Sequence, residues 1–516
     1  MLRMSANESM GPTARNPDRG GAMGRWLVAA TLGLALVALT LYGVAAVAQP
    51  SGRGNATIAT ILWANALVTI IALVIEIRRR PYSLHLMHLI ALFLFFGASA
   101  LFQLSAGRFA VAGSVEGLRK EMLPAALAVS VWIATYVVIY ETHQRLSLGI
   151  PRDAIGRFFN REFSGDRVIA LHFAALAVIA YLGVIGLLGL STRGAAEQAL
   201  VTNANATAGV SGFALALKVI NQYILRGFPL VVMMSGFLVY PRSKGRVRTL
   251  LRPLLLALIV GNLAANNPLA ASRMWLVTIL FGLLAPFVFR RGRSGLLVVL
   301  VTLAGLAVLP ALSESRAALT FDEWLYFSRI ASPLNYLATS ADGDHLGMIS
   351  LAVRWVGSEG HTWGRQILGA ALCWVPRMFW PDKPIGTGAM VTGDLGYGFT
   401  NWSMPIVAEG FVDFSYLGVI GLAALFAWVL SRGDRSYWVG RPEGTLGPRV
   451  IDVLYPLWLG CAIFFTRGDL IAAASHTSPF VFWSLALGVG SSALAARRVA
   501  RSSHHTPPGA KASSAR

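Results

Sequence analysis

A series of long apolar runs constrains this chain most strongly. Each run is about as long as the roughly 20 helical residues that cross the hydrocarbon core of a bilayer, although some only marginally so. Of the 516 residues, 55% are apolar and only 13% are charged, whereas soluble globular domains carry about a quarter charged residues. We therefore predict an all-α, polytopic membrane helix bundle of about twelve spans, at residues 26–48, 55–77, 84–104, 122–141, 168–190, 222–240, 253–271, 274–290, 294–312, 413–431, 452–467 and 470–496.

The positive charge is unevenly distributed along the chain. A formal net charge of +20 is compatible with nucleic-acid binding, but most of the 44 lysines and arginines lie in alternate short loops and in the two tails. This alternation is the positive-inside signature of a membrane protein, and a basic cytoplasmic face suits anionic lipids. We therefore expect membrane lipids and no nucleic acid as partners. The basic segments are residues 3–25, 78–80, 145–167, 242–252, 290–293, 432–449 and 497–516.

The same pattern sets the predicted organisation of the chain. Both termini are expected on the cytoplasmic side, and the long polar segment after the ninth span is expected on the outer side. Only two cysteines occur, Cys373 and Cys461, and both lie in apolar stretches without the neighbours of a metal site. We predict no metal and no cofactor. The expected units are a disordered tail at 1–25, spans one to nine at 26–312, a large periplasmic or extracellular loop at 313–404, spans ten to twelve at 405–496, and a basic tail at 497–516.

The long loop combines charged residues with glycine, proline and tryptophan. Helical apolar spacing at 346–356 and 367–375 predicts two helices that are too short to span, so they should lie on the membrane interface or fold back onto the bundle. Pro376 and Pro381 should then present Arg377 and Lys383 on a stiff segment. Five tryptophans are expected at the level of the lipid headgroups, namely Trp355, Trp363, Trp374, Trp380 and Trp402.

One part of this loop resembles a known family. The segment Val375-Pro-Arg-Met-Phe-Trp-Pro-Asp-Lys-Pro384, a Gly-rich stretch and Ala408-Glu-Gly-Phe-Val-Asp-Phe414 are similar to the bacterial oligosaccharide repeat-unit polymerases (O-antigen polymerase, Wzy type). The spacing from Arg377 to Gly388 also fits the arginine–ten residues–glycine pattern of their outer loops. A second copy starting at Arg273 departs from the pattern, because Leu284 stands where glycine belongs.

The resemblance implies a GT-C-like membrane glycosyltransferase of the bacterial inner membrane. Its substrates would be undecaprenyl-pyrophosphate-linked glycans, joined on the outer face into O-antigen, capsule or exopolysaccharide. A chain-length regulator and a flippase would be further partners. Such chemistry needs cations at the departing pyrophosphate, for which the planar, permanently charged guanidinium is suited.

Arg377 is the leading candidate for the pyrophosphate contact; the alternative is an arginine that reaches to lipid headgroups. Arg273 and Arg467 would converge on the same anion, or else anchor helix ends. Lys383, Arg354 and Gly388 complete the predicted substrate-binding set.

The reaction also needs a base near the acceptor hydroxyl. Glu409, at the outer start of the tenth span, would orient or deprotonate the acceptor, or else pair with an arginine, because an unpaired carboxylate is costly there. Asp344, next to His345, is a second candidate, with a solvated loop position as its alternative. The predicted catalytic set is therefore Arg377, Glu409 and Asp344.

Two other functions remain open. An O-antigen ligase would use a similar fold and donor, but ligases carry a histidine motif in an outer loop and His361 is isolated here. A polysaccharide flippase or exporter would also have twelve spans, but it should show a repeated half and short loops. The long loop favours the polymerase.

Overall fold

The structure is a computed structural model. It describes residues 52–80, 82–146, 154–185, 224–267, 272–288, 318–330, 343–398, 402–439 and 447–489, together with a few isolated positions. These residues are mostly helical. Their two short strands, β1 (Arg108–Phe109) and β2 (Gly113–Ser114), pair antiparallel in a hairpin. The predicted all-α bundle is confirmed at this level.

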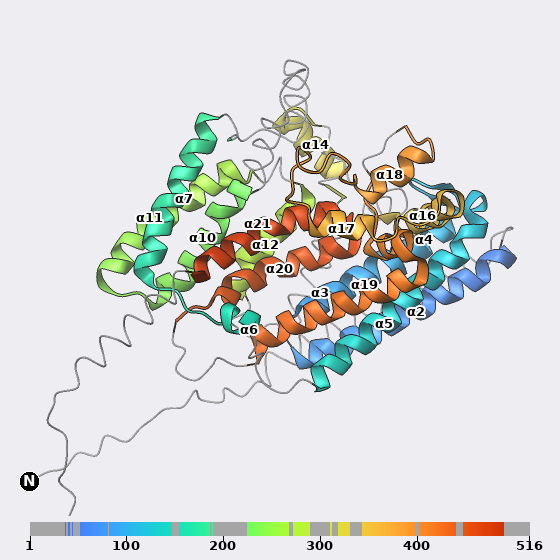
Figure 1. The fold of residues 1–516 in the computed structure, drawn as a ribbon, viewed down its shortest axis with the longest axis horizontal. Helices are drawn as coiled ribbons and strands as arrows, with labels where there is room; N and C mark the ends of the chain where they lie inside the picture. The colour runs from blue at the N-terminus through green and yellow to red at the C-terminus, as the bar shows by residue number, and fades with distance from the viewer. Residues whose placement is uncertain are drawn as a thin grey trace, which may run out of the picture.

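One group of helices packs around a core that contains Leu62, Trp132 and Tyr136. A π-helix, η1, joins α3 to α4, so that the three form one continuous span, and the 3₁₀ turn η2 precedes α5. In Figure 1 these helices run parallel or antiparallel to α19. The group consists of α2 (Gly52–Arg79), α3 (Leu84–Leu92), η1 (Phe93–Ala98), α4 (Ser99–Ala106), η2 (Glu116–Leu118), α5 (Arg119–Leu146) and α19 (Ile406–Trp438).

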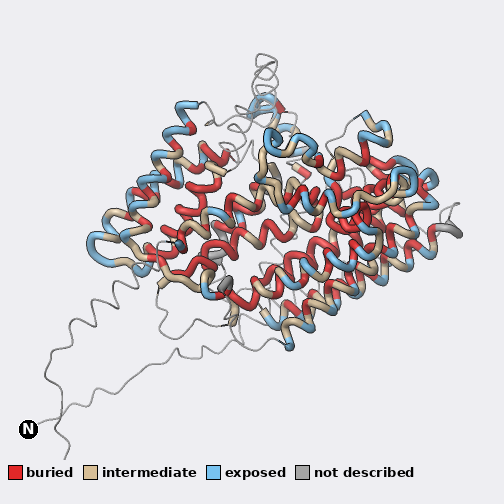
Figure 2. The backbone as a smooth tube through the Cα atoms, viewed as in Figure 1, coloured by how far each residue is buried: buried red, intermediate tan, exposed pale blue. Residues whose placement is uncertain are grey.

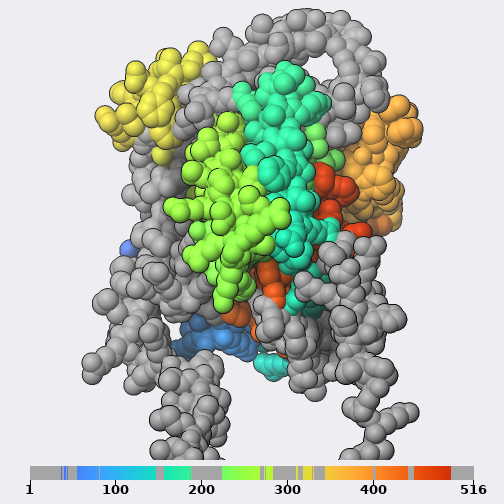
Figure 3. Space-filling model, turned by 90° about the vertical axis from the view of Figure 1, so that its left-hand side faces the viewer, coloured from blue at the N-terminus to red at the C-terminus, as the bar shows by residue number. Residues whose placement is uncertain are grey.

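A second group has a core of its own, which includes Val231 and Met234. Its helices α7 and α11 lie side by side on one face of the molecule (Figure 3). The helix α20 (Val450–Arg467) joins the groups, because Tyr455 packs in the first core and Leu457 in the second. The second group comprises α6 (Ala154–Phe159), α7 (Gly165–Val184), α10 (Arg226–Val239), η4 (Tyr240–Arg242), α11 (Gly245–Ala265), α12 (Arg273–Val288) and α21 (Leu470–Val489).

The surface of the bundle is apolar where the helices face outward. Val138 on α5, Leu256 on α11 and Leu417 on α19 are each more than half exposed, whereas polar side chains such as His88 and Asp434 are buried. Figure 2 shows the buried residues concentrated along the inner faces of the helices. This distribution, apolar outside and polar inside, is that of a multi-pass membrane protein.

The described part of the chain contains eight helices that are long and apolar enough to cross a membrane. They coincide with the predicted spans at 55–77, 84–104, 122–141, 168–190, 253–271, 413–431, 452–467 and 470–496, although several begin or end elsewhere. The predicted spans at 222–240 and 274–290 correspond to α10 and α12, which have 14 and 16 residues. Most of 26–48 and 294–312 lies outside the described residues.

The described parts of the basic segments 78–80, 145–167 and 432–449 meet at one end of the bundle, which we call the basic end. There Arg80 of the α2–α3 turn bonds Tyr140 and Gln144 near the end of α5, and Arg449 before α20 bonds Asn160 after α6. The segment 343–398, which we call the lobe, lies at the opposite end, where Arg354 pairs with Glu121 near the start of α5 and Thr387 bonds Glu409 near the start of α19. The lobe contains α16 (His345–Glu359), α17 (Arg365–Ala371) and α18 (Thr387–Asp394), and α14 (Phe321–Ile330) lies along the same upper edge of Figure 1.

The two helices predicted in the loop fold back onto the bundle. The inner face of α16 is buried against α5 and α19, and its Trp355 is only 6% exposed and donates to Asp394. The predicted headgroup position is therefore wrong for Trp355, whose indole the helix turns inward. The second helix, α17, ends at Ala371 rather than near Val375, because the following residues form turns.

The helix α19 begins at Ile406, seven residues before the predicted start of the span. It breaks at Phe414 and at Ser415, whose φ is 55°. A Cβ on Gly410 would lie 2.8 Å from the carbonyl oxygen of Gly418, so the two parts pack closely across the break. The part before the break belongs with the lobe, and the part after it is the span.

Candidate functional site

Glu409 lies on the first part of α19 and is completely buried. Its Oε1 accepts a hydrogen bond from the backbone N–H of Leu470 at 2.8 Å, and its Oε2 accepts from the hydroxyl of Thr387. No ion pair of Glu409 occurs among the described residues. The carboxylate thus connects the start of α18 to the start of α21, and backbone and hydroxyl donors satisfy it instead of the arginine that the sequence offered as an alternative.

A second carboxylate, Asp469, lies in the turn between α20 and α21. It accepts from the backbone N–H groups of Gly388 at 3.1 Å and Ile471 at 3.1 Å. Burial raises the pKa of Asp469. A Cβ on Gly388 would lie only 1.9 Å from the carbonyl oxygen of Trp402, so only glycine fits at this contact. Gly388 and Glu409 are therefore neighbours in one cluster, with Asp469 between them.

Arg467 is the last residue of α20 and stands two residues before Asp469. It is half-buried, and the preceding Thr466 is completely buried and bonded to His88 Nδ1 at 2.6 Å. The indole N–H of Trp132 donates to His88 Nε2 at 3.3 Å. Because indole is only a donor, Nε2 carries no proton, so Nδ1–H donates to Thr466. These bonds fix the end of α20 beneath the lobe.

The segment 376–385, which we call the cationic loop, holds its two cations by backbone carbonyls. Arg377 Nη1 donates to the carbonyl oxygen of Lys383 at 2.6 Å, and its Nη2 donates to that of Pro384 at 3.3 Å. Lys383 Nζ donates to the carbonyl oxygens of Cys373 and Val375, at 2.6 and 3.0 Å. Carbonyls orient a cation but do not neutralise its charge. Within the described residues neither side chain has a carboxylate partner.

Exposed apolar side chains lie close to these cations in the sequence. Trp374 is 67% exposed and Phe379 is 73% exposed, and Met378 and Ile385 are also exposed. Burial lowers the pKa of Lys383, and the nearby charge of Arg377 acts in the same direction. Aromatic and aliphatic groups beside uncompensated cations are typical of a surface at the level of lipid headgroups.

Asp344 and His345 lie elsewhere, beneath the β1–β2 hairpin. Asp344 is completely buried, and its Oδ2 accepts from the backbone N–H groups of Val111 and Ala112, at 2.5 and 3.1 Å. Burial raises the pKa of Asp344 to about 7 and lowers that of His345, which stacks on Phe95, to about 4. The solvated position offered as the alternative for Asp344 is wrong, because the hairpin covers it.

Two predicted substrate-binding residues remain to be placed, Arg354 and Arg273. Arg354 on α16 pairs with Glu121 of α5 at 3.0 Å and also donates to the carbonyl oxygen of Gly117. Arg273 is the first residue of α12, and its side chain lies outside the described residues. The fold therefore brings Arg377, Lys383, Gly388 and Glu409 to one region with the end of α20, and leaves Asp344 and Arg354 apart. Thr387 and Asp469 also belong to this region, and neither was among the predicted site residues. Only Asp469 could have been found from the sequence, because it follows the predicted site residue Arg467 by two positions.

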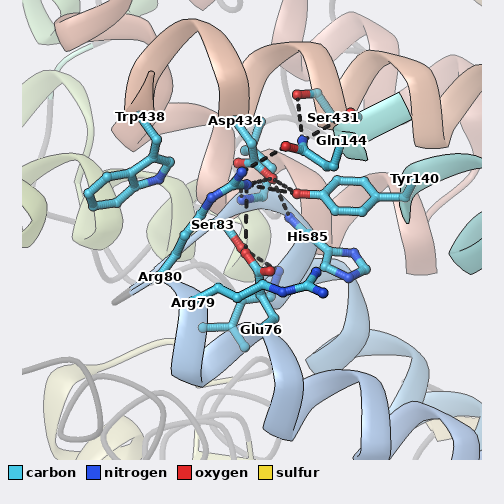
Figure 4. Close-up of polar contacts among 12 residues, drawn as sticks. Glu76, Arg79, Arg80, Ser83, His85, Tyr140, Gln144, Ser431, Asp434 and Trp438 are labelled. Carbon is cyan, nitrogen blue, oxygen red and sulfur yellow. Dashed lines mark hydrogen bonds and ion pairs between the residues drawn. The ribbon is translucent and has the colours of Figure 1, made fainter. Parts of the chain in front are cut away.

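A separate polar cluster at the basic end was not anticipated (Figure 4). Asp434 of α19 is completely buried and accepts from Tyr140 at 2.6 Å, from Tyr455 at 2.5 Å and from the backbone N–H of Leu84 at 2.8 Å. Arg80 lies 3.6 Å from Asp434 and 3.7 Å from Glu76. This cluster ties α2, α3, α5, α19 and α20 together, and its two carboxylates share the cation Arg80.

Among the described residues no group of three or more histidine, cysteine, aspartate or glutamate side chains is placed to hold a metal ion. No protein-family model matches the chain, and neither curated proteins nor solved structures gave a match. The resemblance to the repeat-unit polymerases thus depends on the residues of the loop themselves.

Proposed function

We propose that the chain polymerises undecaprenyl-pyrophosphate-linked oligosaccharide repeat units into surface polysaccharide, on the outer face of the bacterial inner membrane. In this proposal the bundle has twelve spans and a GT-C-like arrangement, the basic end faces the cytoplasm and the lobe faces outward. The observation that carries the proposal is the cationic loop. Arg377 and Lys383 are oriented by carbonyls, have no carboxylate partner within the described residues, and stand among exposed aromatic side chains.

A lipid pyrophosphate matches this surface in both of its parts. Its phosphate oxygens offer the anionic partner that Arg377 and Lys383 lack among the described residues, and its polyisoprenoid tail is compatible with Trp374 and Phe379. Proline at positions 376, 381 and 384 stiffens the loop, so little side-chain and backbone entropy is lost on binding. A cation that is already oriented toward the leaving group stabilises the charge that develops there.

The transfer proceeds by displacement at the anomeric carbon of the donor. The acceptor hydroxyl oxygen forms a bond to that carbon while the bond from carbon to the pyrophosphate oxygen breaks. The pyrophosphate leaves with the electron pair, and the hydroxyl proton passes to a base. Both oxygens of Glu409 accept bonds from the protein, so we assign it the task of holding Thr387 and the α20–α21 turn in place beneath the loop. The base itself remains a prediction.

The test is reconstitution of the purified protein with lipid-linked repeat units, followed by electrophoresis of the glycans. A ladder of products of increasing length supports the polymerase. Transfer to lipid A core without any ladder would instead identify a ligase. Movement of the substrate across a vesicle membrane without a new glycosidic bond would identify a flippase. Either of the last two results overturns the proposal.

A further inference from the structure

The lobe contains a second surface whose chemistry differs from that of the cationic loop. An open pocket lies where α18 ends, and it is lined by Arg354, Leu395, Gly396, Tyr397 and Gly398. Arg354 is 37% exposed and uses Nε and Nη2 for Glu121 and Gly117, which leaves Nη1 without a hydrogen bond in the described structure. The pocket therefore offers a directed donor.

The charged groups around this pocket do not favour an anion. Arg354 forms an ion pair with Glu121, so the pair is neutral as a whole. The nearby carboxylate of Asp394 is exposed, and one of its oxygens accepts from the indole of Trp355 at 2.9 Å. An anion gains little here, in contrast to the cationic loop. A neutral ligand rich in hydroxyl groups gains both donors and acceptors.

The residues that line the pocket also suit a sugar ring. Tyr397 is half-buried and is one of the residues that line the pocket. Gly396 has a φ of 78°, and nothing lies within 4 Å of where its Cβ would be, so a ligand can approach the backbone closely. A sugar ring has a flat apolar face of C–H groups and an edge of hydroxyls. The first packs on an aromatic ring, and the second bonds to arginine and carboxylate side chains.

We infer that the pocket formed by Arg354, Tyr397 and the glycines around it is a saccharide subsite, with Asp394 at its edge. The helix α18 connects it to the cationic loop. Gly388 lies at the start of this helix and Leu395 directly follows its end, so the two are separated by about 10 Å along its axis. A short oligosaccharide can cover that distance. The sugar bound here is the acceptor glycan, an assignment that rests on the proposed function, whereas binding of the sugar itself does not.

The experiment measures binding without turnover. The full-length protein in detergent is titrated with methyl glycosides of glucose, galactose, mannose, rhamnose and N-acetylglucosamine, and binding is followed by saturation-transfer NMR and by tryptophan fluorescence. At least one glycoside should bind, and Tyr397→Ala should weaken its binding roughly fivefold to tenfold. Tyr397→Phe, which keeps the ring, should bind nearly as well as the wild type. Tyr326→Ala, which removes an exposed tyrosine of α14, is the matched control.

The inference fails if no glycoside binds, or if Tyr397→Ala binds as tightly as the wild type. Its failure is distinguishable from that of the proposed function. Binding at Tyr397 without any chain extension would retain the saccharide subsite and reject the polymerase. Chain extension by the wild type that is unchanged in Tyr397→Ala, with no glycoside binding, would retain the polymerase and reject the subsite.

Discussion

Two arginines of this protein, Arg80 and Arg377, differ in whether the protein itself neutralises their positive charge. Arg80 lies at the basic end beside the buried carboxylate of Asp434, within hydrogen-bond distance of Tyr140 and Gln144. Arg377 lies in the lobe, is exposed, and bonds only to carbonyl oxygens in the described structure. The charge of Arg80 is neutralised by a buried carboxylate, whereas the charge of Arg377 is available to a ligand.

The difference teaches how to separate structural from functional cations in a membrane protein. The buried carboxylate of Asp434 needs an ion-pair partner in the bundle, because an unpaired buried charge costs several kcal/mol. Arg80 is therefore retained for stability. Arg377 contributes little to folding, because it is exposed and neutralises no buried carboxylate among the described residues. Substitutions at the two sites should change different measurements.

The largest effect on stability is expected for Arg80→Ala. Removal of the guanidinium leaves Asp434 buried beside Glu76 without their cation, which should lower the free energy of unfolding by about 3–5 kcal/mol. The adjacent Arg79→Ala is the matched control, because its pair with Glu141 is partly exposed and should be worth about 0–1 kcal/mol. Thermal unfolding of the purified proteins in detergent gives both values. Equal losses for the two variants would contradict the distinction.

Arg377→Ala should have the largest effect on activity. We expect chain extension to fall about 100-fold, as when a preorganised donor to a developing anion is removed, with no change in the midpoint of thermal unfolding. Arg377→Lys should restore little activity, because lysine lacks the planar fork that bonds two phosphate oxygens.

Arg329→Ala, at an exposed arginine of α14, controls for the loss of one positive charge. Chain extension at the wild-type rate by Arg377→Ala would remove this residue from the proposed site.

A smaller effect is expected beneath the cationic loop, at Thr387. Thr387→Val keeps the shape of the side chain but removes the donor to Glu409, and an unsatisfied buried carboxylate oxygen costs about 1–3 kcal/mol. Thr387→Ser keeps the hydroxyl and should retain most of the stability. Unfolding midpoints and extension rates of the two variants, measured side by side, test whether Glu409 holds the site together. Identical behaviour of valine and serine would exclude that role.

The last effect concerns the pH dependence of stability at Asp344, where a second group offsets part of the change. Its pKa in the folded protein is about 7, above the ordinary value of 3.8, so the folded state binds the proton more tightly than the unfolded state. The resulting stabilisation is fully present below pH 3.8 and is lost as the pH rises to about 7. His345, whose pKa is lowered to about 4, acts in the opposite direction over part of this range.

Asp344→Asn isolates the contribution of the carboxyl group, because His345 is present in both proteins. Compared with the wild type, the variant should lose less stability between pH 4 and pH 7. The check is the difference between the two unfolding midpoints across that range. A constant difference would show that Asp344 does not titrate there.

Several features could be predicted from the sequence because they depend on local pattern. Apolar runs located the eight described spans, and the alternation of basic segments anticipated that Arg80 and Arg449 would share one end of the bundle. Helical spacing in the loop located α16 and α17. The position of Trp355 could not be predicted in this way, because only packing against the neighbouring helices decides which tryptophans of the loop are buried.

The candidate site was predictable only in part, for the same reason. The sequence by itself determined a helical membrane protein with a stiff, positively charged loop, because hydrophobic length and proline act over a few neighbouring residues. Only the tertiary structure decided that Glu409 meets Thr387, that Asp469 meets Gly388, and that Asp434 meets the start of α3 some 350 residues away in the chain. Those pairings follow from the requirement that every buried carboxylate find donors, and the donors come from whichever helices the bundle brings beside it.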